Sequence, residues 1–500
     1  MTTVVRTAAG AVRGRREDGL TVFRGIPFAQ PPVGEARFAA PRPVRAWEGT
    51  REAYAFGPPP PQESGIQGRK AVQEMLEGDD WLTVNVWTPE ADPAARRPVM
   101  VWIYGGAYKI GHAGSPGYDA QRIARDGDVV VVTLNYRVGI EGFARIDGAP
   151  ANRGLLDQVA ALEWVRDNVT AFGGDPGQVT VFGESAGAGS VASLLAMPAA
   201  RGLFRRAVAQ SVPGTYFSDE LARDIASAIA EEAGLRPTAA DLATVDPRQL
   251  TSASEALSAK MTSYGDRWGR VAPTSTPFSP VVDGEVLPCA PWQALAAGAG
   301  RDVDLLVGHN RDEFRLFLAI GGLLGTIGEE QASWALRTFG PGADGERAYR
   351  AAFPEATPGE LFERVQTDWL FNVPSLRLAE AQLAGGGPAH VYELAWPAPG
   401  GLGACHGLDI PLLFGTFEAD LGMLLFPGGG VPAEAESLSA RFRSSWTAFA
   451  RTGDPGWPAY DDRKRLVQVL DAVSEVVPYP EETARRLWEG HEFTELPLLK

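Results

Sequence analysis

The sequence predicts an α/β protein built on a mostly parallel sheet with helices on both of its faces. Up to residue 220, short β-branched and aromatic runs alternate with segments of helical spacing, as in sheets whose strands are joined by helices. Residues 129–135 are apolar almost throughout, which is typical of a strand that is covered on both faces. Residues 179–195 read as a strand, a turn of small residues and a helix, which completes the pattern.

The amino-terminal half is expected to supply most of the strands. Residues 3–26 alternate short apolar runs with glycine, which indicates a small antiparallel meander. Residues 57–78 are polar and include four consecutive prolines, which predicts a loop that either covers a pocket or lies on the open surface. Further central strands are expected at residues 82–87, 99–104 and 179–182. A helix is expected at residues 155–169, before the last of these strands.

Beyond residue 220 the sequence is mainly helical. Strand-like runs at 304–308 and 391–394 interrupt it, and residues 316–385 between them predict a helical insertion that can roof a pocket. Near the end, a stripe of large apolar residues at helical spacing stops at Gly453. Because no repeat, linker or low-complexity segment divides the chain, residues 1–500 are expected to form a single domain with this insertion.

Composition excludes several classes of function. The 500 residues carry a formal net charge of −16, which disfavours nucleic acids and anionic membranes as partners. No apolar run reaches transmembrane length, and no secretory signal is recognised at the amino terminus. With only two cysteines, Cys289 and Cys405, a disulfide framework is not expected, and a reduced, cytoplasmic protein without metal or cofactor is predicted.

The motif Gly183-Glu184-Ser185-Ala186-Gly187 lies between the expected strand at 179–182 and a helix of small residues. Strand, Gly-x-Ser-x-Gly and helix in this order form the nucleophile elbow of the α/β-hydrolases. The turn is too sharp for side chains beside the serine, so small residues stand two before and two after it. The motif therefore predicts an α/β-hydrolase fold in which Ser185 is the nucleophile.

A serine hydroxyl needs a base to take its proton and an acid to orient that base, and this fold supplies them in the order Ser, acid, His. Among only five histidines, His406 follows the strand at 391–394 in a loop, which is where the base belongs. The acid should follow the strand at 304–308. Asp312 and Glu313 both fit by spacing, and either can instead be a surface carboxylate beside an arginine.

An oxyanion hole is the third requirement of this chemistry. Tyr104-Gly105-Gly106-Ala107 follows the strand at 99–104, and its small residues leave backbone N–H groups open to a ligand. The N–H of Ala186 adds a donor at the start of the helix after the nucleophile.

Longer motifs give a resemblance that covers nearly the whole chain. They are Phe23-Arg24-Gly25-Ile26-Pro27-Phe28-Ala29, Phe172-Gly173-Gly174-Asp175-Pro176, Arg311-Asp312-Glu313 and Cys405-His406 with Asp409-Ile410-Pro411. In these the sequence resembles the type-B carboxylesterases, which include bacterial para-nitrobenzyl esterases and are related to the cholinesterases. The resemblance implies that Glu313, rather than Asp312, is the acid of the triad. It also implies Gly106, Ala107 and Ala186 as the oxyanion donors.

Three positions depart from the pattern of this family. Trp81 stands where secreted members usually have a disulfide cysteine, which agrees with a reduced compartment. Tyr104 stands where many bacterial members have histidine, although cholinesterases tolerate tyrosine there. Val212 replaces a usual glycine near the expected acyl site, which leaves the size of the substrate open.

The predicted function is that of a serine carboxylesterase that hydrolyses small-molecule esters, short-chain or aryl esters first, through an acyl-enzyme. The same machinery also suits a transacylase, a lactonase or an amidase. A non-catalytic binding protein on this fold, as in the neuroligins, is an alternative, but it is expected to lack an intact triad. A cysteine hydrolase using Cys405 is disfavoured, because Cys405 adjoins His406 in sequence and lies on no elbow. The oligomeric state is left open.

Overall fold

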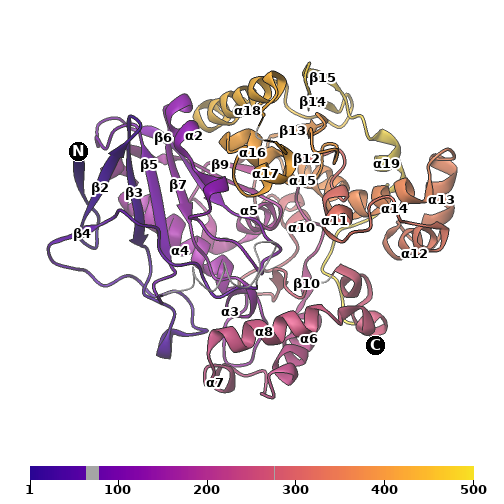
Figure 1. Ribbon diagram of the computed structural model, residues 1–500, viewed down its shortest axis with the longest axis horizontal. Helices are drawn as coiled ribbons and strands as arrows, with labels where there is room; N and C mark the ends of the chain where they lie inside the picture. Colours follow the sequence, from indigo (N-terminus) through magenta and orange to yellow (C-terminus); the bar gives the residue numbers. More distant parts are fainter. Residues whose placement is uncertain (64–77, 275, 429, 500) are drawn as a thin grey trace. The chain divides into compact units, whose positions relative to one another are not determined.

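The computed structural model describes residues 1–63, 78–274, 276–428 and 430–499 (Figure 1). These residues fall into two compact units. The first contains residues 1–207, 215–291 and 495–500, and the second contains residues 208–214 and 292–494. Most of the loop expected at 57–78, namely residues 64–77, lies outside the described part of the chain. Whether both units belong to a single domain stays a prediction.

The first unit is built on a mixed sheet in the order β1-β2-β3-β5-β7-β6-β8, with β4 beside β2. Its strands are β1 (Thr2–Arg6), β2 (Ala11–Glu17), β3 (Leu20–Pro27), β4 (Thr50–Glu52), β5 (Thr83–Thr88), β6 (Arg97–Ile103), β7 (Val130–Leu134) and β8 (Gly174–Glu184). The pairs β7–β6 and β6–β8 are parallel, whereas β1, β2, β3 and β5 pair in antiparallel fashion. The predicted parallel centre and the predicted meander are therefore confirmed.

Strand β5 differs from its parallel neighbours in direction. It pairs antiparallel with both β3 and β7. No helix separates β5 from β6 in the sequence, and two strands that run in the same direction need a long connection that is usually helical. Strand β5 therefore runs opposite to β6. In contrast, α2 (Gln121–Gly127) and α4 (Arg153–Asn168) precede β7 and β8, which run parallel to β6.

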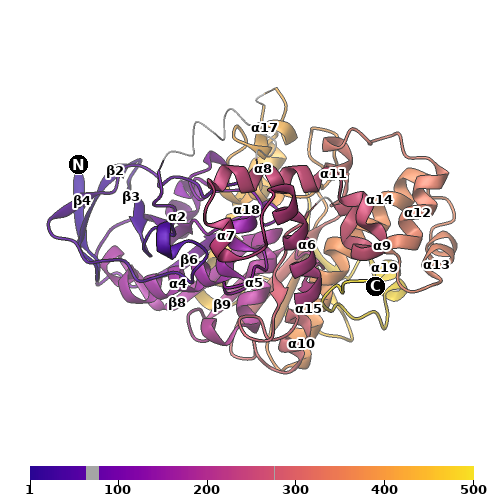
Figure 2. The same ribbon diagram turned by 90° about the horizontal axis from the view of Figure 1, so that it is seen from below.

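The helices of the first unit surround the strand that leads to the nucleophile elbow. Helices α4 and α5 (Ala186–Ala196) pack against each other and against β8 (Figure 2). The remaining regular elements of this unit are α3 (Gly139–Gly142), β10 (Phe217–Ser218), α6 (Asp219–Glu232), α7 (Ala239–Leu242), α8 (Pro247–Ser258), α9 (Gly265–Trp268) and β11 (Val281–Val282). The chain passes from the first unit to the second within β9 (Arg206–Gln210).

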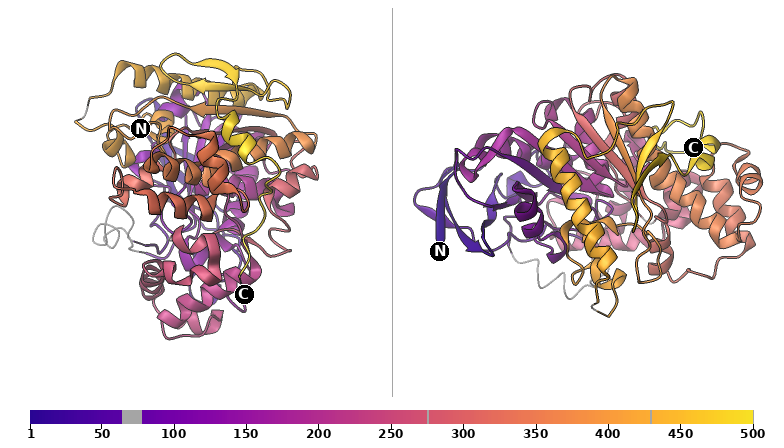
Figure 3. Two further views of the ribbon diagram at one scale, coloured as in Figure 1. Left: turned by 90° about the vertical axis from the view of Figure 1, so that its right-hand side faces the viewer. Right: turned by 90° about the horizontal axis from the view of Figure 1, so that it is seen from above.

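The second unit has its own strands. The parallel strands β12 (Asp304–Asn310), β13 (Ala389–Leu394) and β14 (Leu466–Leu470) lie in this order, and β15 (Glu475–Pro478) joins β14 as an antiparallel hairpin. Figure 3 shows this yellow hairpin beside the orange β13. All six residues of β13 are buried, as are all but the first of β12. Both strands were expected from the sequence.

Helices fill the chain between β12 and β13. They are α11 (Arg315–Ile320), α12 (Glu329–Phe339), α13 (Gly345–Ala352), α14 (Pro358–Thr367), the π-helix η7 (Asp368–Asn372) and α15 (Val373–Ala384). Helices α12, α13 and α14 pack on one another, and α13 also meets α19 (Glu482–Leu487) (Figures 1 and 2). The other helices of this unit are α10 (Pro291–Ala296), which starts at the unit boundary, α16 (Asp409–Phe414), α17 (Leu421–Leu425) and α18 (Ala433–Thr452).

Helix α18 ends as the sequence indicates, because Gly453 follows it in the left-handed conformation, with φ at 83°. Within the described ranges, no helix combines the length and the apolar character that a membrane crossing requires.

Candidate active site

Ser185 lies at the sharp turn between β8 and α5 in the first unit. Its backbone has φ 56° and ψ −123°, which is a strained conformation for a residue with a side chain. It is the N-cap of α5, and its carbonyl accepts the N–H of Gly189 at 2.9 Å. The nucleophile elbow that the sequence predicts is therefore present as a backbone feature.

The two glycines of the elbow are required by close backbone contacts. A Cβ at Gly187 would lie 2.0 Å from the carbonyl oxygen of Ile103. A Cβ at Gly183 would lie 2.7 Å from that same oxygen and from the carbonyl of Gly187. Since real carbon–oxygen contacts are longer than roughly 3 Å, neither position can hold a larger residue unless the backbone moves.

The loop Gly105-Gly106-Ala107 lies directly beside the elbow. A Cβ at Gly105 would come within 3.1 Å of the Cβ of Ser185. Gly106 and Ala107 have φ at 109° and 55°, and the N–H groups of Lys109 and Ile110 donate to the Gly106 carbonyl and close the turn. Within the described chain, the N–H groups of Gly106, Ala107 and Ala186 donate to no protein group.

Three backbone N–H groups that have no protein acceptor and lie close to a serine can stabilise a developing negative charge. The donor at Ala186 lies at the start of α5, where the helix dipole adds a partial positive charge. The segments that the sequence predicts for an oxyanion hole thus lie in one place within the first unit.

Tyr104, one of the departures from the family pattern, supports this loop from below. Its ring is fully buried and stacks on that of Tyr136 at a centroid distance of 4.4 Å. Its hydroxyl donates to the Tyr136 carbonyl at 3.1 Å, and the Tyr136 hydroxyl donates back to the Tyr104 carbonyl at 2.6 Å. Tyr104 therefore fixes the end of β6 where the glycine loop begins.

The second unit contains a close pair of an imidazole and a carboxylate. His406 Nδ1 and Glu313 Oε2 are 2.5 Å apart, the Glu313 side chain has no exposed surface, and 8% of the His406 side chain is exposed. The backbone N–H of His406 also donates to the Glu313 carbonyl at 3.3 Å. A carboxylate at Nδ1 fixes the tautomer that carries its proton on Nδ1 and its lone pair on Nε2, the atom that can act as a base.

Two further groups hold the other oxygen of Glu313. The Ser211 hydroxyl donates to Oε1 at 2.5 Å and the Asn310 backbone N–H donates to it at 2.8 Å. Ser211 follows β9 with φ at 59°, and its own N–H donates to the Gly308 carbonyl. This role of Ser211 was not predicted from the sequence, although its hydroxyl stands at the end of a buried strand and next to Val212.

Asp312 faces elsewhere. Its Oδ2 accepts the N–H of Ala404 at 2.9 Å, and its Oδ1 accepts a hydrogen bond from the Arg315 guanidinium at 3.1 Å. Asp312 thus braces the loop that carries His406, whereas Glu313 contacts the imidazole itself. Of the two carboxylates that spacing left open, the structure brings Glu313 to His406.

Aromatic rings surround the imidazole. The Phe371 ring stacks on His406 at 4.3 Å, and the Phe317 ring lies 5.1 Å from it. Phe317 is 37% exposed although it is large and apolar. Both rings come from the helices between β12 and β13, and Phe371 belongs to the π-helix η7. Sequence periodicity did not single out Phe371, because a π-helix interrupts the 3.6-residue repeat.

Both cysteines are free thiols. Cys405 is buried, and this burial raises the pKa of its thiol to about 12, which makes a thiolate nucleophile unfavourable. Among the described residues, no group of three or more His, Cys, Asp or Glu side chains could hold a metal ion.

The predicted site residues form two groups. Ser185, Gly106, Ala107 and Ala186 lie together in the first unit, and Glu313 and His406 lie together in the second. The elbow at the end of β8 and the parallel strands with flanking helices define the chain as an α/β-hydrolase.

Comparison with known proteins assigns the family. The model of the Carboxylesterase family matches residues 1–337 and 348–482. The para-nitrobenzyl esterase of Bacillus subtilis is 35% identical over 499 residues, which cover 97% of this chain and 98% of the relative. The phenmedipham hydrolase of Pseudarthrobacter oxydans is 35% identical over 483 residues, 93% of this chain and 94% of the relative.

A solved structure agrees with these relatives. The crystal structure of the Geobacillus stearothermophilus carboxylesterase EST55 superposes with a TM-score of 0.84 at 38% identity, covering 97% of this chain and all of that one. The chain belongs to the Carboxylesterase family and is a carboxylic ester hydrolase.

Proposed function

We propose that Ser185, His406 and Glu313 act as one catalytic triad for the hydrolysis of small-molecule esters. The observation that carries this proposal is the 2.5 Å contact between His406 and Glu313, since it prepares an imidazole to accept a proton at Nε2. The strained serine of the elbow is the nucleophile that such a base serves.

In the proposed reaction, Ser185 Oγ attacks the ester carbonyl while His406 takes its proton. Glu313 stabilises the resulting imidazolium, and the N–H groups of Gly106, Ala107 and Ala186 stabilise the oxyanion. His406 then protonates the leaving alcohol. Water, activated by the same imidazole, attacks the acyl-enzyme, which releases the acid and regenerates the Ser185 hydroxyl.

The exposed Phe317 ring beside the imidazole supports a preference for aryl or other apolar esters. The para-nitrobenzyl esterase among the relatives agrees with this preference. Relatives named as esterases and hydrolases favour hydrolysis over the transacylase, lactonase and amidase alternatives. The two free cysteines support a reduced, cytoplasmic location, which stays a prediction, as do the absence of nucleic-acid and membrane partners and of cofactors.

A labelling experiment tests the proposal. We expect the enzyme to hydrolyse 4-nitrophenyl esters of increasing acyl length. Phenylmethanesulfonyl fluoride should abolish this activity and add one sulfonyl group, which peptide mass mapping should locate on Ser185. Full inhibition with the label on another residue would overturn the assignment of the nucleophile.

A further inference from the structure

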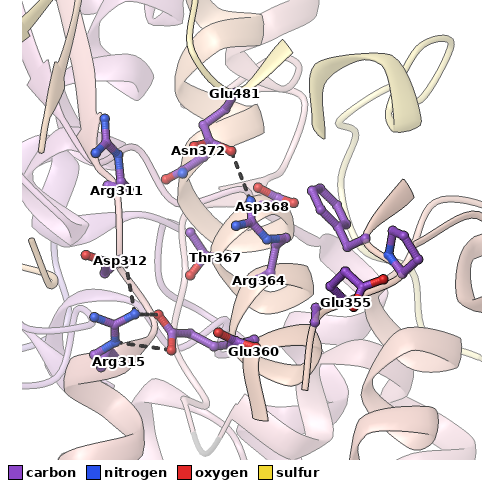
Figure 4. A pocket seen from close by; sticks show the side chains of 14 residues that line it. Arg311, Asp312, Arg315, Glu355, Glu360, Arg364, Thr367, Asp368, Asn372 and Glu481 are labelled. Atoms are coloured by element: carbon purple, nitrogen blue, oxygen red, sulfur yellow. Dashed lines mark hydrogen bonds and ion pairs between the residues drawn. The ribbon is translucent and has the colours of Figure 1, made fainter. Parts of the chain in front are cut away.

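A cavity in the second unit lies beside the π-helix η7. It has a volume of about 410 Å³, which is within the range of small-molecule sites. Among its described lining residues, six are carboxylates and three are arginines. The carboxylates are Asp312, Glu355, Glu360, Glu363, Asp368 and Glu481 (Figure 4).

All three arginines form ion pairs with carboxylates. A guanidinium held in an ion pair has less charge to offer to a bound anion. Their partners are Glu393 for Arg311 at 2.6 Å, Asp312 and Glu363 for Arg315 at 3.1 and 3.0 Å, and Glu481 for Arg364 at 3.0 Å. The unbalanced charge of the cavity is therefore negative.

Asp368 is the most deeply buried of these carboxylates. It is 1% exposed, and the Tyr349 hydroxyl donates to its Oδ2 at 2.7 Å. Among the described residues no ion pair joins Asp368 to an arginine or a lysine. Burial consequently raises the pKa of this carboxyl to about 7, and a positive charge in the cavity would reverse that effect.

Asn372 lines the cavity at the other end of η7. It is 2% exposed, and its Oδ1 has no hydrogen-bond partner among the described groups. Figure 4 shows its amide between Arg311 and Asp368. An amide oxygen without a donor loses free energy when buried, so a ligand with N–H groups would satisfy it. Short π-helical segments of this kind are frequent at functional sites.

We propose that this cavity binds a small protonated amine, with its ammonium group between Asp368 and Asn372. An ammonium supplies three N–H donors and one positive charge, which matches a carboxylate and an amide oxygen. Phe353 and Pro354 line another part of the cavity and offer apolar surface to an alkyl chain. None of the lining residues belongs to the proposed triad, so the test does not depend on ester hydrolysis.

Isothermal titration calorimetry with 1,4-diaminobutane tests the proposal. We expect saturable binding of one diamine molecule per chain. The affinity for the neutral 1,4-butanediol should be lower by about tenfold or more. Asp368→Asn keeps the size of the side chain and its bond with Tyr349, and it should weaken diamine binding about tenfold or more. Asp302→Asn removes an exposed carboxylate outside the cavity and should leave the affinity unchanged.

Hydrogen exchange of the wild-type enzyme gives a readout that needs no variant. Diamine should slow exchange in peptides that cover residues 364–372. Lack of saturable binding, equal binding of the diol, equal affinity in Asp368→Asn, or protection only outside these peptides would overturn the proposal. Tight binding of succinate without binding of the diamine would assign the cavity to an anion instead and would also overturn it.

Discussion

The two halves of the proposed triad are held in place by different physical means. In the first unit, Ser185 is positioned by backbone sterics, with a strained φ of 56° and glycines that stand where a Cβ would strike a carbonyl. In the second unit, His406 and Glu313 are positioned by side-chain hydrogen bonds from residues far apart in the sequence, such as Ser211.

This difference shows which residues of the sequence determine each part of the site. Five consecutive residues specify the elbow, so its information is local. The acid–base pair depends on β9, the end of β12 and the loop after β13, so its information is spread over about 200 residues of the chain. Substitutions that change the backbone conformation should therefore disrupt the elbow. Substitutions that remove a single hydrogen-bonding atom should disrupt the pair of His406 and Glu313.

Ser185→Ala is the change with the largest expected effect. It removes the nucleophile and should lower kcat/KM for 4-nitrophenyl acetate by about five orders of magnitude. Because alanine has nearly the same backbone requirements as serine at this turn, Tm should stay within about 3 °C of the wild type. Steady-state kinetics and a thermal melt measure both quantities. Wild-type activity in this variant would remove Ser185 from the mechanism.

Glu313→Gln should have the next largest effect. It removes the charge that stabilises the His406 imidazolium, and we expect kcat to fall about a thousandfold or more. Asp312→Asn is the matched control: its amide oxygen can keep one of the two hydrogen bonds, from Ala404 or from Arg315, and the side chain faces away from the imidazole, so it should cost about tenfold at most. If the two losses were exchanged, Asp312 rather than Glu313 would be the acid.

Gly187→Ala tests the steric half of the comparison. The added Cβ would lie 2.0 Å from the Ile103 carbonyl oxygen, so the elbow backbone must move. We expect the free energy of unfolding to drop by about 3 kcal/mol or more, with loss of activity in any folded fraction. Gly265→Ala places a Cβ where no atom lies within 4 Å, and because Gly265 has helical backbone angles it should leave the free energy of unfolding unchanged or raise it by about 1 kcal/mol at most. Equal stability of both variants would show that sterics do not fix the elbow.

The sequence predicted the local half of this molecule well. Strands β5, β6, β7 and β8 lie within a few residues of their predicted positions, because long β-branched runs admit few other structures. The glycine loop and the elbow were read directly from small residues next to such strands.

The distributed half could not be read in the same way. Asp312 and Glu313 are adjacent in a turn, and which one faces His406 depends on donors such as Ser211, which lies 102 residues away from Glu313. The choice came from the family resemblance and not from spacing. Phe371 escaped notice because its place against His406 results from a π-helix, which has no simple sequence period.

The smallest expected effect concerns Asp368, at the start of the π-helix that presents Phe371 to His406. The charged and titratable groups that face Asp368 are Tyr349 of α13, Arg364 of α14 and Glu481. Burial raises the pKa of this carboxyl from 3.8 to about 7 in the folded protein. Between these values the unfolded chain has released the proton and the folded chain retains it.

The unfolded state therefore binds fewer protons in this window, and the contribution of Asp368 to stability falls as the pH rises from about 4 to about 7. The side-chain amide of the variant Asp368→Asn cannot ionise, so this variant lacks that loss. We expect the Tm of the wild type to decline by several degrees relative to Asp368→Asn across the window, with no further divergence above about pH 8. Thermal melts of both proteins at about six pH values measure this difference, and Asp302→Asn controls for removal of an exposed carboxylate. If the difference in Tm between the two proteins did not change with pH, the charge of the Asp368 carboxylate would be fully stabilised by its neighbours in the folded protein. The carboxylate at the start of the π-helix would then resemble that of Glu313, whose oxygens accept hydrogen bonds from Ser211 and Asn310.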